Sequence, residues 1–379
     1  MSKMNWSKRQ WKDVLSIVNG KNQKDVESDD GLYPIIGSGG KIGRATKYLC
    51  EAGSTVVGRK GTINNPFFVD ERFWNVDTAF GIQPGKLLNP KFLFYFCKSY
   101  NFKKLDKSTT IPSLAKTDLL KIEMPVPSLE EQGKIVNRIE ELFSELDSAV
   151  ETLKKTKEQL AVYRQSVLKE AFENVEASQV RLDDLCDFIT KGTTPSKSKM
   201  NTETSSIPFI KVYNLTFDLS LDFSIDPTFV NENTHNTFLA RSKVLPGDVL
   251  MNIVGPPMGK VSIVPETYPE WNMNQAIARF RCEDNLNNRY LAYFLGCKQT
   301  VEKMMRQSKA TAGQFNLTLE ICRNIQIPLP SIKEQKAIVS VLDKQLSVCK
   351  GIEKTVNDAL AQAEAMRQSI LKKAFEGSL

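Results

Sequence analysis

The sequence predicts an α+β protein in which two globular units of short strands and helices are separated by two long antiparallel helices that form a coiled coil. Three observations predict this fold: an internal duplication, a heptad pattern of apolar residues in each copy, and short strand-like runs between glycine and proline turns elsewhere. A chain of 379 residues has room for two or three domains, each with its own core. We place the first globular unit at residues 1–123, the first helix at 124–173, the second unit at 174–326 and the second helix at 327–379.

The duplication aligns residues 124–173 with residues 327–376 without a gap. The first copy begins MPVPSLEEQGKIVNRIEELF and ends RQSVLKEAFE, and the second begins IPLPSIKEQKAIVSVLDKQL and ends RQSILKKAFE. One inserted residue would rotate everything beyond it by about 100° around the helix axis. Uninterrupted spacing of this kind is typical of a rod that serves as a spacer of fixed length. A duplicated chain of this kind can also fold with approximate two-fold symmetry.

Each copy carries the start signal of a long helix. Prolines keep the approach extended, and Ser128 with Glu131 forms an S-x-x-E capping box, which Ser331 with Glu334 repeats. Apolar residues then recur at alternating steps of four and three, the pattern of a coiled coil. They are Ile135, Ile139, Leu142, Leu146, Ala149, Leu153, Leu160, Tyr163 and Val167 in the first copy, and Ile338, Leu342, Cys349, Ile352, Val356, Ala359, Ala363, Met366 and Ile370 in the second. About 43 residues make a rod on the order of 65 Å, and its natural partner is the other copy.

The globular units show the pattern of small mixed folds. In the first unit the strand-like runs YPIIG, STVVG and PFFVD alternate with glycine turns, and PKFLFYFCKSYNF is typical of a helix. In the second unit IPFIKVYNLTF, VLMNIVG and VSIVP are strand-like and are separated by proline and glycine turns. We therefore expect α+β architecture in both units.

Composition excludes several classes of protein. The seven cysteines stand singly without a C-x-x-C motif, which favours reduced thiols over disulfides or a zinc site. The one histidine, His235, rules out a multi-histidine metal site, and we expect it in an exposed loop. No apolar run approaches the roughly 20 residues of a membrane helix, and the N-terminal residues lack the apolar segment of a signal peptide. We expect a cytoplasmic protein.

The net charge of +7 is unevenly distributed. Residues 1–129 hold 20 basic and 12 acidic side chains, whereas residues 174–332 hold 16 of each. An excess of this size in the first unit suits a partner that carries phosphate groups.

A glycine-rich loop in the first unit invites a phosphate-loop interpretation, which fails. The segment GSGGKIGR has Ile35 and Ile42 where a P-loop requires a glycine and a serine or threonine. Two interpretations remain open: glycines for a tight turn, or a loop that brings Lys41 and Arg44 onto a DNA backbone. The segment GRKGT, with Arg59 and Lys60, is a second loop of the same type.

Taken together, these features show that the chain resembles, over essentially its whole length, the specificity subunit of a type I restriction-modification system. The resemblance is carried by IPLPSIKEQKAIVSVLD, LPGDVLMNIVG and VRLDDLCDFITKGTTP, and in the first half by YPIIGSGG, GRKGT and FWNVDTAF. It implies two target recognition domains, each of which reads one half of a split DNA sequence. It also implies two adenine-N6 methyltransferase subunits and motor-nuclease subunits as partners, with S-adenosylmethionine, magnesium and ATP bound by those partners and no catalysis by this chain.

On this basis we chose candidate site residues by residue type and loop position. Candidates for DNA binding are Lys41, Arg44, Arg59, Lys60, Lys103, Lys104, Lys107, Thr109, Lys191, Lys197, Tyr213, Lys260, Asn274, Arg306, Lys309, Thr311 and Gln314. Candidates for binding the methyltransferase are Pro125, Pro127, Glu131, Gln132, Pro328, Pro330, Glu334 and Gln335, at the corners where the two long helices begin.

Two alternatives stay open at this point. The chain could be an enzyme with an unrecognised site, either a nuclease that uses carboxylates such as Asp70, Glu71 and Asp77 as metal ligands or a self-sufficient DNA methyltransferase. The segment NPFF is similar to the Asn-Pro-Pro-aromatic loop of adenine methyltransferases, but it has a single proline. The chain could also be a coiled-coil adaptor that binds only proteins, in which case DNA binding would show no sequence preference at any salt concentration.

Overall fold

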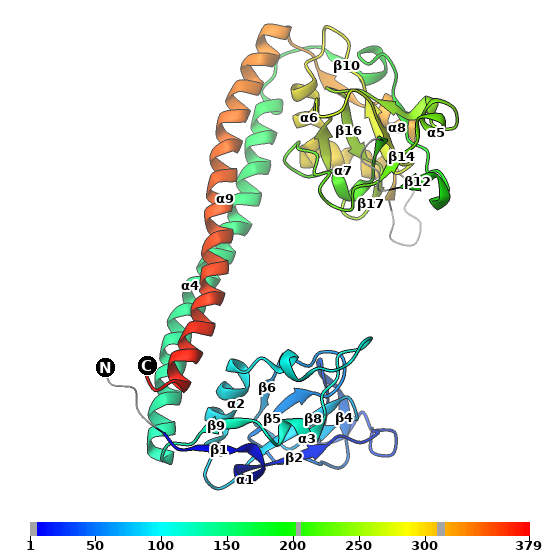
Figure 1. Ribbon diagram of the computed structural model, residues 1–379. Helices are drawn as coiled ribbons and strands as arrows, with labels where there is room; N and C mark the ends of the chain where they lie inside the picture. The colour runs from blue at the N-terminus through cyan, green and yellow to red at the C-terminus, as the bar shows by residue number, and fades with distance from the viewer. Residues whose placement is uncertain (1–5, 202–205, 309–314) are drawn as a thin grey trace. The chain divides into compact units, whose positions relative to one another are not determined.

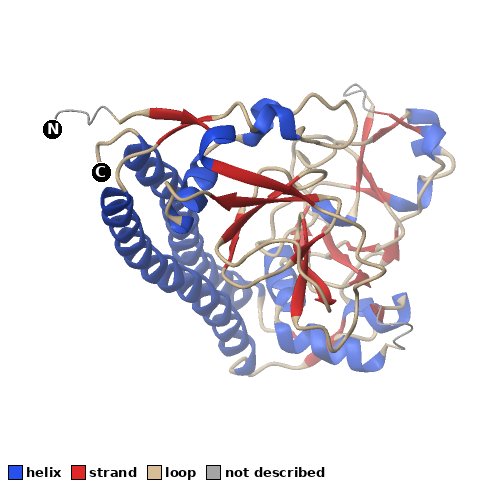
Figure 2. Ribbon diagram, turned by 90° about the horizontal axis from the view of Figure 1, so that it is seen from below, coloured by secondary structure: helices blue, strands red, loops and turns tan. Residues whose placement is uncertain are grey.

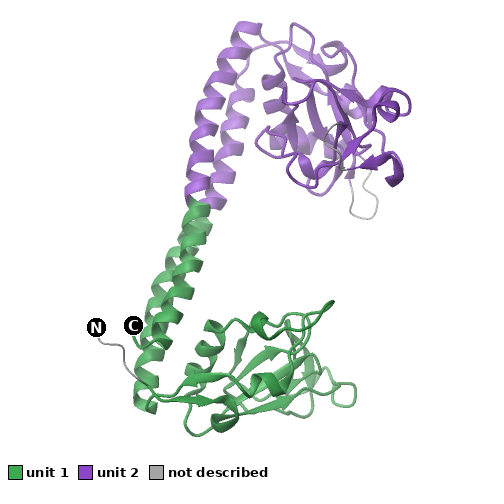
Figure 3. Cartoon of the chain, in the orientation of Figure 1, with its two compact units in different colours: residues 1–155, 356–379 green, residues 156–355 purple. Residues whose placement is uncertain are grey.

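The computed structural model describes residues 6–201, 206–308 and 315–379. The chain forms two compact units, and each unit contains one globular part with a segment of both long helices (Figure 3). Unit 1 comprises residues 1–155 and 356–379, and unit 2 comprises residues 156–355. Short strands joined by long loops make up the globular parts, beside the two long helices (Figure 2). The α+β class with two long helices is thus confirmed.

The globular part of unit 1 contains nine strands and several short helices among its described residues. The strands are β1 (Lys8–Gln10), β2 (Leu15–Asn19), β3 (Tyr33–Gly37), β4 (Gly40–Ala45), β5 (Ser54–Gly58), β6 (Phe67–Val69), β7 (Trp74–Asn75), β8 (Ala79–Pro84) and β9 (Glu123–Pro125). The helices are α1 (Trp11–Val14), α2 (Pro90–Ser99), the 3-10 helix η1 (Phe102–Leu105) and α3 (Lys116–Leu119).

The globular part of unit 2 has more and shorter elements. The strands are β10 (Gln179–Arg181), β11 (Thr190–Lys191), β12 (Met200–Asn201), β13 (Ile207–Ile210), β14 (Phe229–Val230), β15 (Lys243–Val244), β16 (Val249–Asn252), β17 (Val254–Gly255), β18 (Val261–Ile263), β19 (Trp271–Met273), β20 (Ile277–Phe280), β21 (Phe315–Asn316) and β22 (Gln326–Pro328). The helices are η2 (Leu182–Asp184), η3 (Lys197–Lys199), η4 (Val212–Asn214), α5 (Glu232–Asn236), η5 (Ala240–Ser242), α6 (Asn288–Gly296), α7 (Lys298–Gln307) and α8 (Leu319–Arg323).

Each globular part contains its own four-stranded sheet, and the two sheets have equivalent strand orders. An antiparallel sheet of order β2-β8-β5-β6 in unit 1 has its counterpart in the antiparallel sheet β11-β20-β16-β18 of unit 2. Beside it, one parallel pair recurs: β3 with β7 in unit 1 and β13 with β19 in unit 2. The central strands β5 and β16 are buried along their whole length, which explains why apolar residues follow one another in STVVG and VLMN and do not alternate with exposed polar ones. The duplication thus extends to the folds of the globular parts.

A short strand pair closes each globular part where its long helix starts. In unit 1, β1 pairs with β9 and places Lys8 opposite Pro125. In unit 2, β10 pairs with β22 and places Gln179 opposite Pro328. The first and last strands of each part are therefore hydrogen-bonded neighbours.

The long helices are α4 (Leu129–Glu173) and α9 (Ile332–Phe375). Each unit contains the first part of one helix and the last part of the other, so they pack antiparallel within each unit (Figure 1). The capping box predicted at the second start is present: Ser331 N donates to Glu334 Oε2 at 2.9 Å, and Glu334 N donates to Ser331 Oγ at 3.4 Å. At the first start, Glu131 N donates to Ser128 Oγ at 3.3 Å.

Most positions of the predicted apolar seam are buried or half-buried, and Ala149 is among the few that are exposed. On α9, buried residues recur every seventh position at Leu342, Cys349, Val356 and Ala363. The prediction is wrong for Tyr163, Ile352 and Met366, which are 49%, 43% and 54% exposed. A pair of helices buries only a narrow stripe, so apolar residues off its centre stay in solvent where no globular part covers them.

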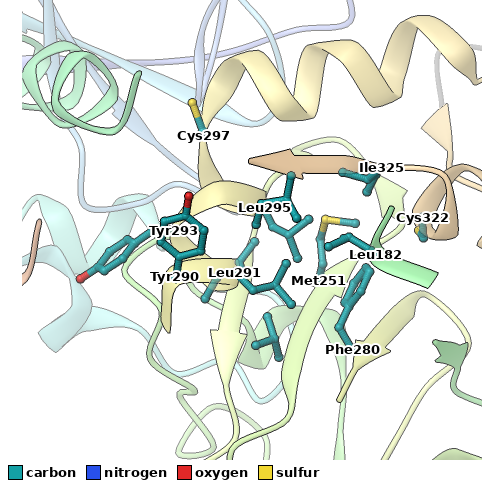
Figure 4. Packing of buried hydrophobic residues seen from close by; sticks show 14 of the residues in the cluster. Leu182, Met251, Phe280, Tyr290, Leu291, Tyr293, Leu295, Cys297, Cys322 and Ile325 are labelled. Carbon is teal, nitrogen blue, oxygen red and sulfur yellow. The ribbon is translucent and has the colours of Figure 1, made fainter. Parts of the chain in front are cut away.

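Both long helices contribute to the hydrophobic core of each unit. In unit 2 the core joins α6, β16 and β20, and Figure 4 shows Tyr290, Leu291 and Phe280 among its packed side chains. Phe172, near the end of α4, contacts the rings of Tyr290 and Phe294 with centroid distances of 5.1 Å and 5.3 Å. These contacts join the end of α4 to the α6 face of the globular part.

Unit 1 repeats this aromatic contact with the end of α9. Phe375 lies 5.1 Å from the ring of Phe92 and 5.3 Å from that of Phe96, both on α2. Besides packing against each other, the two long helices therefore each place the phenylalanine near their end on a helix of a globular part, in the same way in both units.

One expectation from composition is wrong. His235 lies on α5 and is 1% exposed, with Nε2 3.0 Å from Glu270 Oε2 and Nδ1 3.0 Å from Asn272 Nδ2. Two polar partners more than 30 residues away in the sequence stabilise the buried ring. Among the residues that the structure describes, no helix is long and apolar enough to span a membrane.

Candidate nucleic-acid interface

In unit 1, two loops that are far apart in the sequence are held together by backbone hydrogen bonds. One loop follows β5, and the other lies at residues 106–115 before α3. Gly61 N donates to Pro112 O at 2.9 Å, and Leu114 N donates to Arg59 O at 2.9 Å. We call residues 59–62 and 106–115 the paired loops of unit 1. These backbone hydrogen bonds hold the two loops side by side.

Predicted DNA-binding cations gather on and beside these paired loops. They are Arg59 and Lys60 on the first loop, Lys107 on the second, and Lys103 and Lys104 on η1 immediately before it. The guanidinium carbon of Arg59 lies 5.8 Å from the ring centroid of Phe80, and Lys107 Nζ lies 2.8 Å from Asp118 Oδ2. The Lys107 side chain is 78% exposed, and an exposed ion pair contributes little stability. A phosphate group can therefore replace Asp118 as its partner at small cost.

Asp106, which the sequence reasoning missed, shapes the second loop. Its Oδ1 accepts hydrogen bonds from Ser108 N at 3.0 Å, Ser108 Oγ at 2.6 Å and Ser113 N at 3.1 Å. The hydrogen bonds from Ser108, and then that from Ser113, hold the pKa of Asp106 below its ordinary value. An aspartate two residues before a serine is the signal of such a turn. Thr109, the remaining candidate on this loop, is exposed.

The glycine-rich segment with Lys41 and Arg44 forms a tight hairpin between β3 and β4. Gly40 has φ +123°, a backbone conformation that favours glycine, so the glycines form a tight turn, and contact of Lys41 and Arg44 with DNA stays a prediction. Arg44 donates from its guanidinium to Gly31 O and to Leu32 O, and it thereby stabilises a neighbouring turn. Lys41 is exposed at the hairpin.

The turn after β7 connects this hairpin sheet with the paired loops. Val76 N donates to Ile36 O at 2.9 Å, on the hairpin side. Arg59 N donates to Thr78 O at 2.7 Å, on the loop side. The turn at residues 76–78 therefore links the hairpin that carries Lys41 to the loop that carries Arg59.

Unit 2 has an equivalent contact, and we call its described segments 253–260 and 315–317 the paired loops of unit 2. β17 pairs with β21, which places Val254 opposite Asn316, and Leu317 N donates to Ile253 O at 2.8 Å. The turn after β19 joins the pair, because Ile253 N donates to Ala276 O at 2.9 Å. The candidate Asn274 lies in this turn, half-buried, and its Oδ1 accepts a hydrogen bond from Ala276 N at 3.2 Å.

Asn252 organises the first of these loops as Asp106 organises a loop of unit 1. The side chain of Asn252 is buried, and its Nδ2 donates to Pro257 O at 2.8 Å. Its Oδ1 accepts from the backbone N–H of the candidate Lys260 at 2.9 Å. The signal that could have identified Asn252 is an asparagine at a strand end, directly before a loop rich in proline and glycine.

The other candidates of unit 2 divide into two groups. Lys191 lines a groove together with Gln307, Ser308 and Asn316, and Arg306 lies near the end of α7 beside this groove. Tyr213 and Lys197 lie on the separate 3-10 helices η4 and η3, and the Tyr213 hydroxyl donates to Asp226 Oδ2 at 2.6 Å. No hydrogen bond between described residues links Tyr213 or Lys197 to the paired loops of unit 2. Lys309, Thr311 and Gln314 lie outside the described residues.

The candidates for partner binding need correction at three positions. Gln132, Gln335 and Pro328 are buried, so their side chains are not on the surface that the prediction required. The two glutamines bond internally to backbone groups, and Pro328 lies in the strand pair of β10 with β22. Pro125, Pro127, Glu131, Pro330 and Glu334 are exposed or half-buried at the two helix starts, where they stay predictions.

The carboxylates considered for a metal-dependent nuclease do not converge. Within residues 6–201, 206–308 and 315–379, no group of three or more His, Cys, Asp or Glu side chains could hold a metal ion. Asn65 of the NPFF segment accepts a hydrogen bond from Lys98 Nζ at 3.3 Å.

Comparison with known proteins gives a consistent result. The family model described as "Type I restriction modification DNA specificity domain" matches residues 3–161 and 174–362. The EcoBI type I restriction enzyme specificity subunit of Escherichia coli is 26% identical, over 86% of this chain and 73% of its own length. The putative type I restriction enzyme specificity subunit S.HindORF215P of Haemophilus influenzae is 24% identical over 96% of both chains.

Two solved structures share the fold. The HsdS subunit from Thermoanaerobacter tengcongensis matches with a TM-score of 0.51 at 20% identity, over 99% of this chain and 97% of that one. A chain from a structural study of complex assembly and conformational transition of the type I R-M system matches with a TM-score of 0.75 at 20% identity, over the whole of both chains.

Proposed function

The chain belongs to the family of type I restriction-modification DNA specificity proteins, and on that premise we propose that it reads an asymmetric DNA sequence of two separated half-sites, one with each unit. The observation that carries the proposal is the duplication itself, which repeats one sheet and one pair of loops in two different sequences. Because the loops of the two globular parts differ in sequence, the two parts, which we call readers, select half-sites of different sequence. Helices of fixed length between them select one spacing.

In each reader the paired loops and the adjoining turn are the DNA-contacting surface. Cations on and beside the loops of unit 1 contact phosphate groups, and Arg59 at their edge reaches a base. In the globular part of unit 2, where residues 174–332 hold as many acidic as basic side chains, Lys191 and Arg306 hold the DNA backbone and Asn274 reads a base. Tyr213 and Lys197 contribute only if DNA extends beyond the paired loops.

Chemistry belongs to partner subunits in this proposal. Two adenine-N6 methyltransferase subunits bind the exposed residues at the helix starts and supply S-adenosylmethionine, and motor-nuclease subunits supply ATP and magnesium chemistry. The chain itself transfers no methyl group and cuts no DNA. Its contribution is to select the sequence and to position the methyltransferase on it.

Methylation by purified components tests this division of labour. The chain alone is expected to leave duplex DNA unchanged with S-adenosylmethionine and magnesium, and addition of the partner methyltransferase is expected to methylate adenine at one bipartite sequence. Turnover by the chain alone, or methylation without sequence preference, would overturn the proposal.

Salt dependence of DNA binding tests the paired loops. Loss of one phosphate contact in Lys60→Ala is expected to reduce the slope of log K against log salt by about 1, without changing which sequence binds best. Lys134→Ala, an exposed lysine on α4 away from these loops, is the matched control. An unchanged slope in Lys60→Ala would exclude Lys60 from the interface, and a slope near zero in the wild type would favour a protein-only adaptor.

A further inference from the structure

Two glutamines of the long helices, Gln132 and Gln335, are fully buried, each four residues after the serine that caps its helix. The Oε1 of Gln132 accepts a hydrogen bond from Asn89 N at 2.7 Å. Its Nε2 donates to Leu87 O and to Pro127 O, both at 2.9 Å. The amide therefore uses both of its hydrogens and its oxygen.

Gln335 makes the same three bonds at the equivalent positions of the duplication. Its Oε1 accepts from Asn287 N at 2.8 Å, and its Nε2 donates to Asn285 O at 3.0 Å and to Pro330 O at 2.9 Å. Because both halves contain the same three buried hydrogen bonds, these bonds belong to the duplicated part of the fold. We call each set of three bonds an amide latch.

Each latch joins three segments at the point where a globular part meets its long helix. Asn89 is the residue that caps α2, and Asn287 is the residue that caps α6, both in globular parts. Pro127 and Pro330 belong to the extended approach, and the glutamine belongs to the long helix itself. A rotation of the helix relative to the globular part would break at least one of these bonds.

Other contacts at this joint are less directional. Ile135, Val136 and Ile139 pack into the core of unit 1, but apolar packing does not prefer one angle strongly. Lys91 Nζ lies 2.7 Å from Glu140 Oε1, an ion pair between half-exposed side chains. Hydrogen bonds to a planar amide, in contrast, tolerate only small changes of angle when all partners are buried.

We propose that Gln132 and Gln335 are positioning residues that fix the angle between each globular part and the long helix that follows it. This angle sets the distance between the two DNA half-sites that the chain accepts. The inference rests on the proposed function, and it replaces the assignment of these glutamines to partner binding.

The length of the helices makes this angle important. A helix of 45 residues, such as α4, is about 68 Å long. A tilt of about 3° at its start displaces the far end by about 3.5 Å, which is about one base-pair step of DNA. A latch that opposes such a tilt therefore favours one spacing over its neighbours.

The test uses the complex of the full chain with its partner methyltransferase and a set of duplexes in which the distance between half-sites changes by one base pair at a time. Gln132→Ala and Gln335→Ala are compared with Gln159→Ala and Gln362→Ala, which make the same change at exposed positions on the same helices. Wild type and controls are expected to methylate one spacing. Each latch variant is expected to reduce the preference for that spacing over its neighbours by about tenfold or more, with the half-site sequences unchanged.

The outcomes separate the two proposals. Retention of the full spacing preference in a folded Gln132→Ala complex would overturn the latch, and so would an equal loss of methylation at every spacing. Where Gln132→Ala lowers the folded fraction, Gln132→Met keeps the side-chain length without the amide and is expected to give the same loss of preference. Absence of sequence-specific methylation by the wild-type complex would instead overturn the proposed function itself.

Discussion

Equivalent positions of the two long helices form different ion pairs in the two units. In unit 1, Asp147 on α4 pairs with Arg367 on α9, and the guanidinium carbon of Arg367 lies 5.1 Å from the ring centroid of Phe143. The duplication places Lys350 at the position of Asp147 and Arg164 at the position of Arg367. Unit 2 therefore has two cations where unit 1 has opposite charges.

In unit 2, Lys350 pairs with the globular part instead. Its Nζ lies 2.6 Å from Asp218 Oδ2, and Asp218 Oδ1 accepts hydrogen bonds from Thr216 and Ser220 at 2.6 Å each. Burial alone would raise the pKa of Asp218, but the hydrogen bonds from Lys350, Ser220 and Thr216 outweigh it and hold the pKa well below its ordinary value.

The comparison separates what the duplication preserved from what diverged. Buried and directional contacts are the same in both units: the amide latches, the aromatic contacts of the helix ends and the strand pairs beside the helix starts. Exposed charges have changed partners. Half-exposed ion pairs contribute little stability, so their exchange costs little, whereas a change in a buried hydrogen bond costs much more.

The largest expected effect is at a pair of glycines that both units need. A Cβ atom at Gly20 would lie 1.8 Å from Val76 O, and one at Gly192 would lie 2.1 Å from Asn274 O. We expect Gly20→Ala and Gly192→Ala to destabilise their own globular part by about 4 kcal/mol or more, because a backbone carbonyl must move. Hydrogen–deuterium exchange resolved by unit measures this, and a harmless substitution in one unit alone would break the equivalence of the two turns.

The second-largest loss of stability is expected from removing the aromatic contacts of the helix ends. Phe172→Ala and Phe375→Ala each remove a ring that packs on two others, and each is expected to lower the free energy of unfolding of its unit by about 2 to 3 kcal/mol. Equal losses would sharpen the comparison. Tyr163→Ala, at an exposed position of α4, is the control and is expected to change stability by less than about 0.5 kcal/mol.

A smaller effect distinguishes the units. Asp218→Asn is expected to lower the stability of unit 2 by about 1 kcal/mol near neutral pH, and that of unit 1 not at all. Because the folded-state pKa of Asp218 lies below the unfolded value, its contribution is complete above about pH 4 and is lost as pH falls below that value.

Acid unfolding followed separately in each unit measures this contribution. The acid limb of unit 2 should flatten in Asp218→Asn, and that of unit 1 should not change. An unchanged acid limb of unit 2 would show that the bond to Lys350 is not formed in solution.

The smallest effect is expected at the ion pair of unit 1. Asp147→Lys gives unit 1 the two cations of unit 2 and should cost about 0.5 kcal/mol at low salt and less at high salt, because the Asp147 side chain is 62% exposed. Thermal unfolding at two salt concentrations measures the difference. A loss of several kcal/mol would mean that this pair, and not the buried contacts, holds the helices together.

The sequence predicted the long helices and the central strands because their signals are local. A capping serine, seven-residue periodicity and apolar runs between glycines depend on neighbours in the chain. The wrong assignments depend on distant residues. His235 is buried because Glu270 and Asn272 reach its ring, and Gln132 is buried because the α2 cap lies beside it.

In the candidate interface, too, the sequence predicted what depends on local patterns and missed what depends on distant residues. The sequence predicts Arg59 and Lys60 from a basic glycine loop and Lys107 from a separate cluster of cations, and the structure bonds the backbone of the first loop to that of the loop that contains Lys107. The hydrogen bonds that pair these loops join residues about 50 positions apart, and no local pattern encodes them. Asp106 and Asn252 were missed because their role is to hold a loop, and a turn-forming residue resembles any other polar residue in the sequence.

The strand pairs β1 with β9 and β10 with β22 have a consequence for how such proteins diversify. Since each globular part enters and leaves through adjacent backbone segments, an unrelated domain whose termini are equally close can be grafted there without altering the helix that follows. Such a graft would change the sequence that one unit reads and would leave the long helices, and the spacing that they set, as they are.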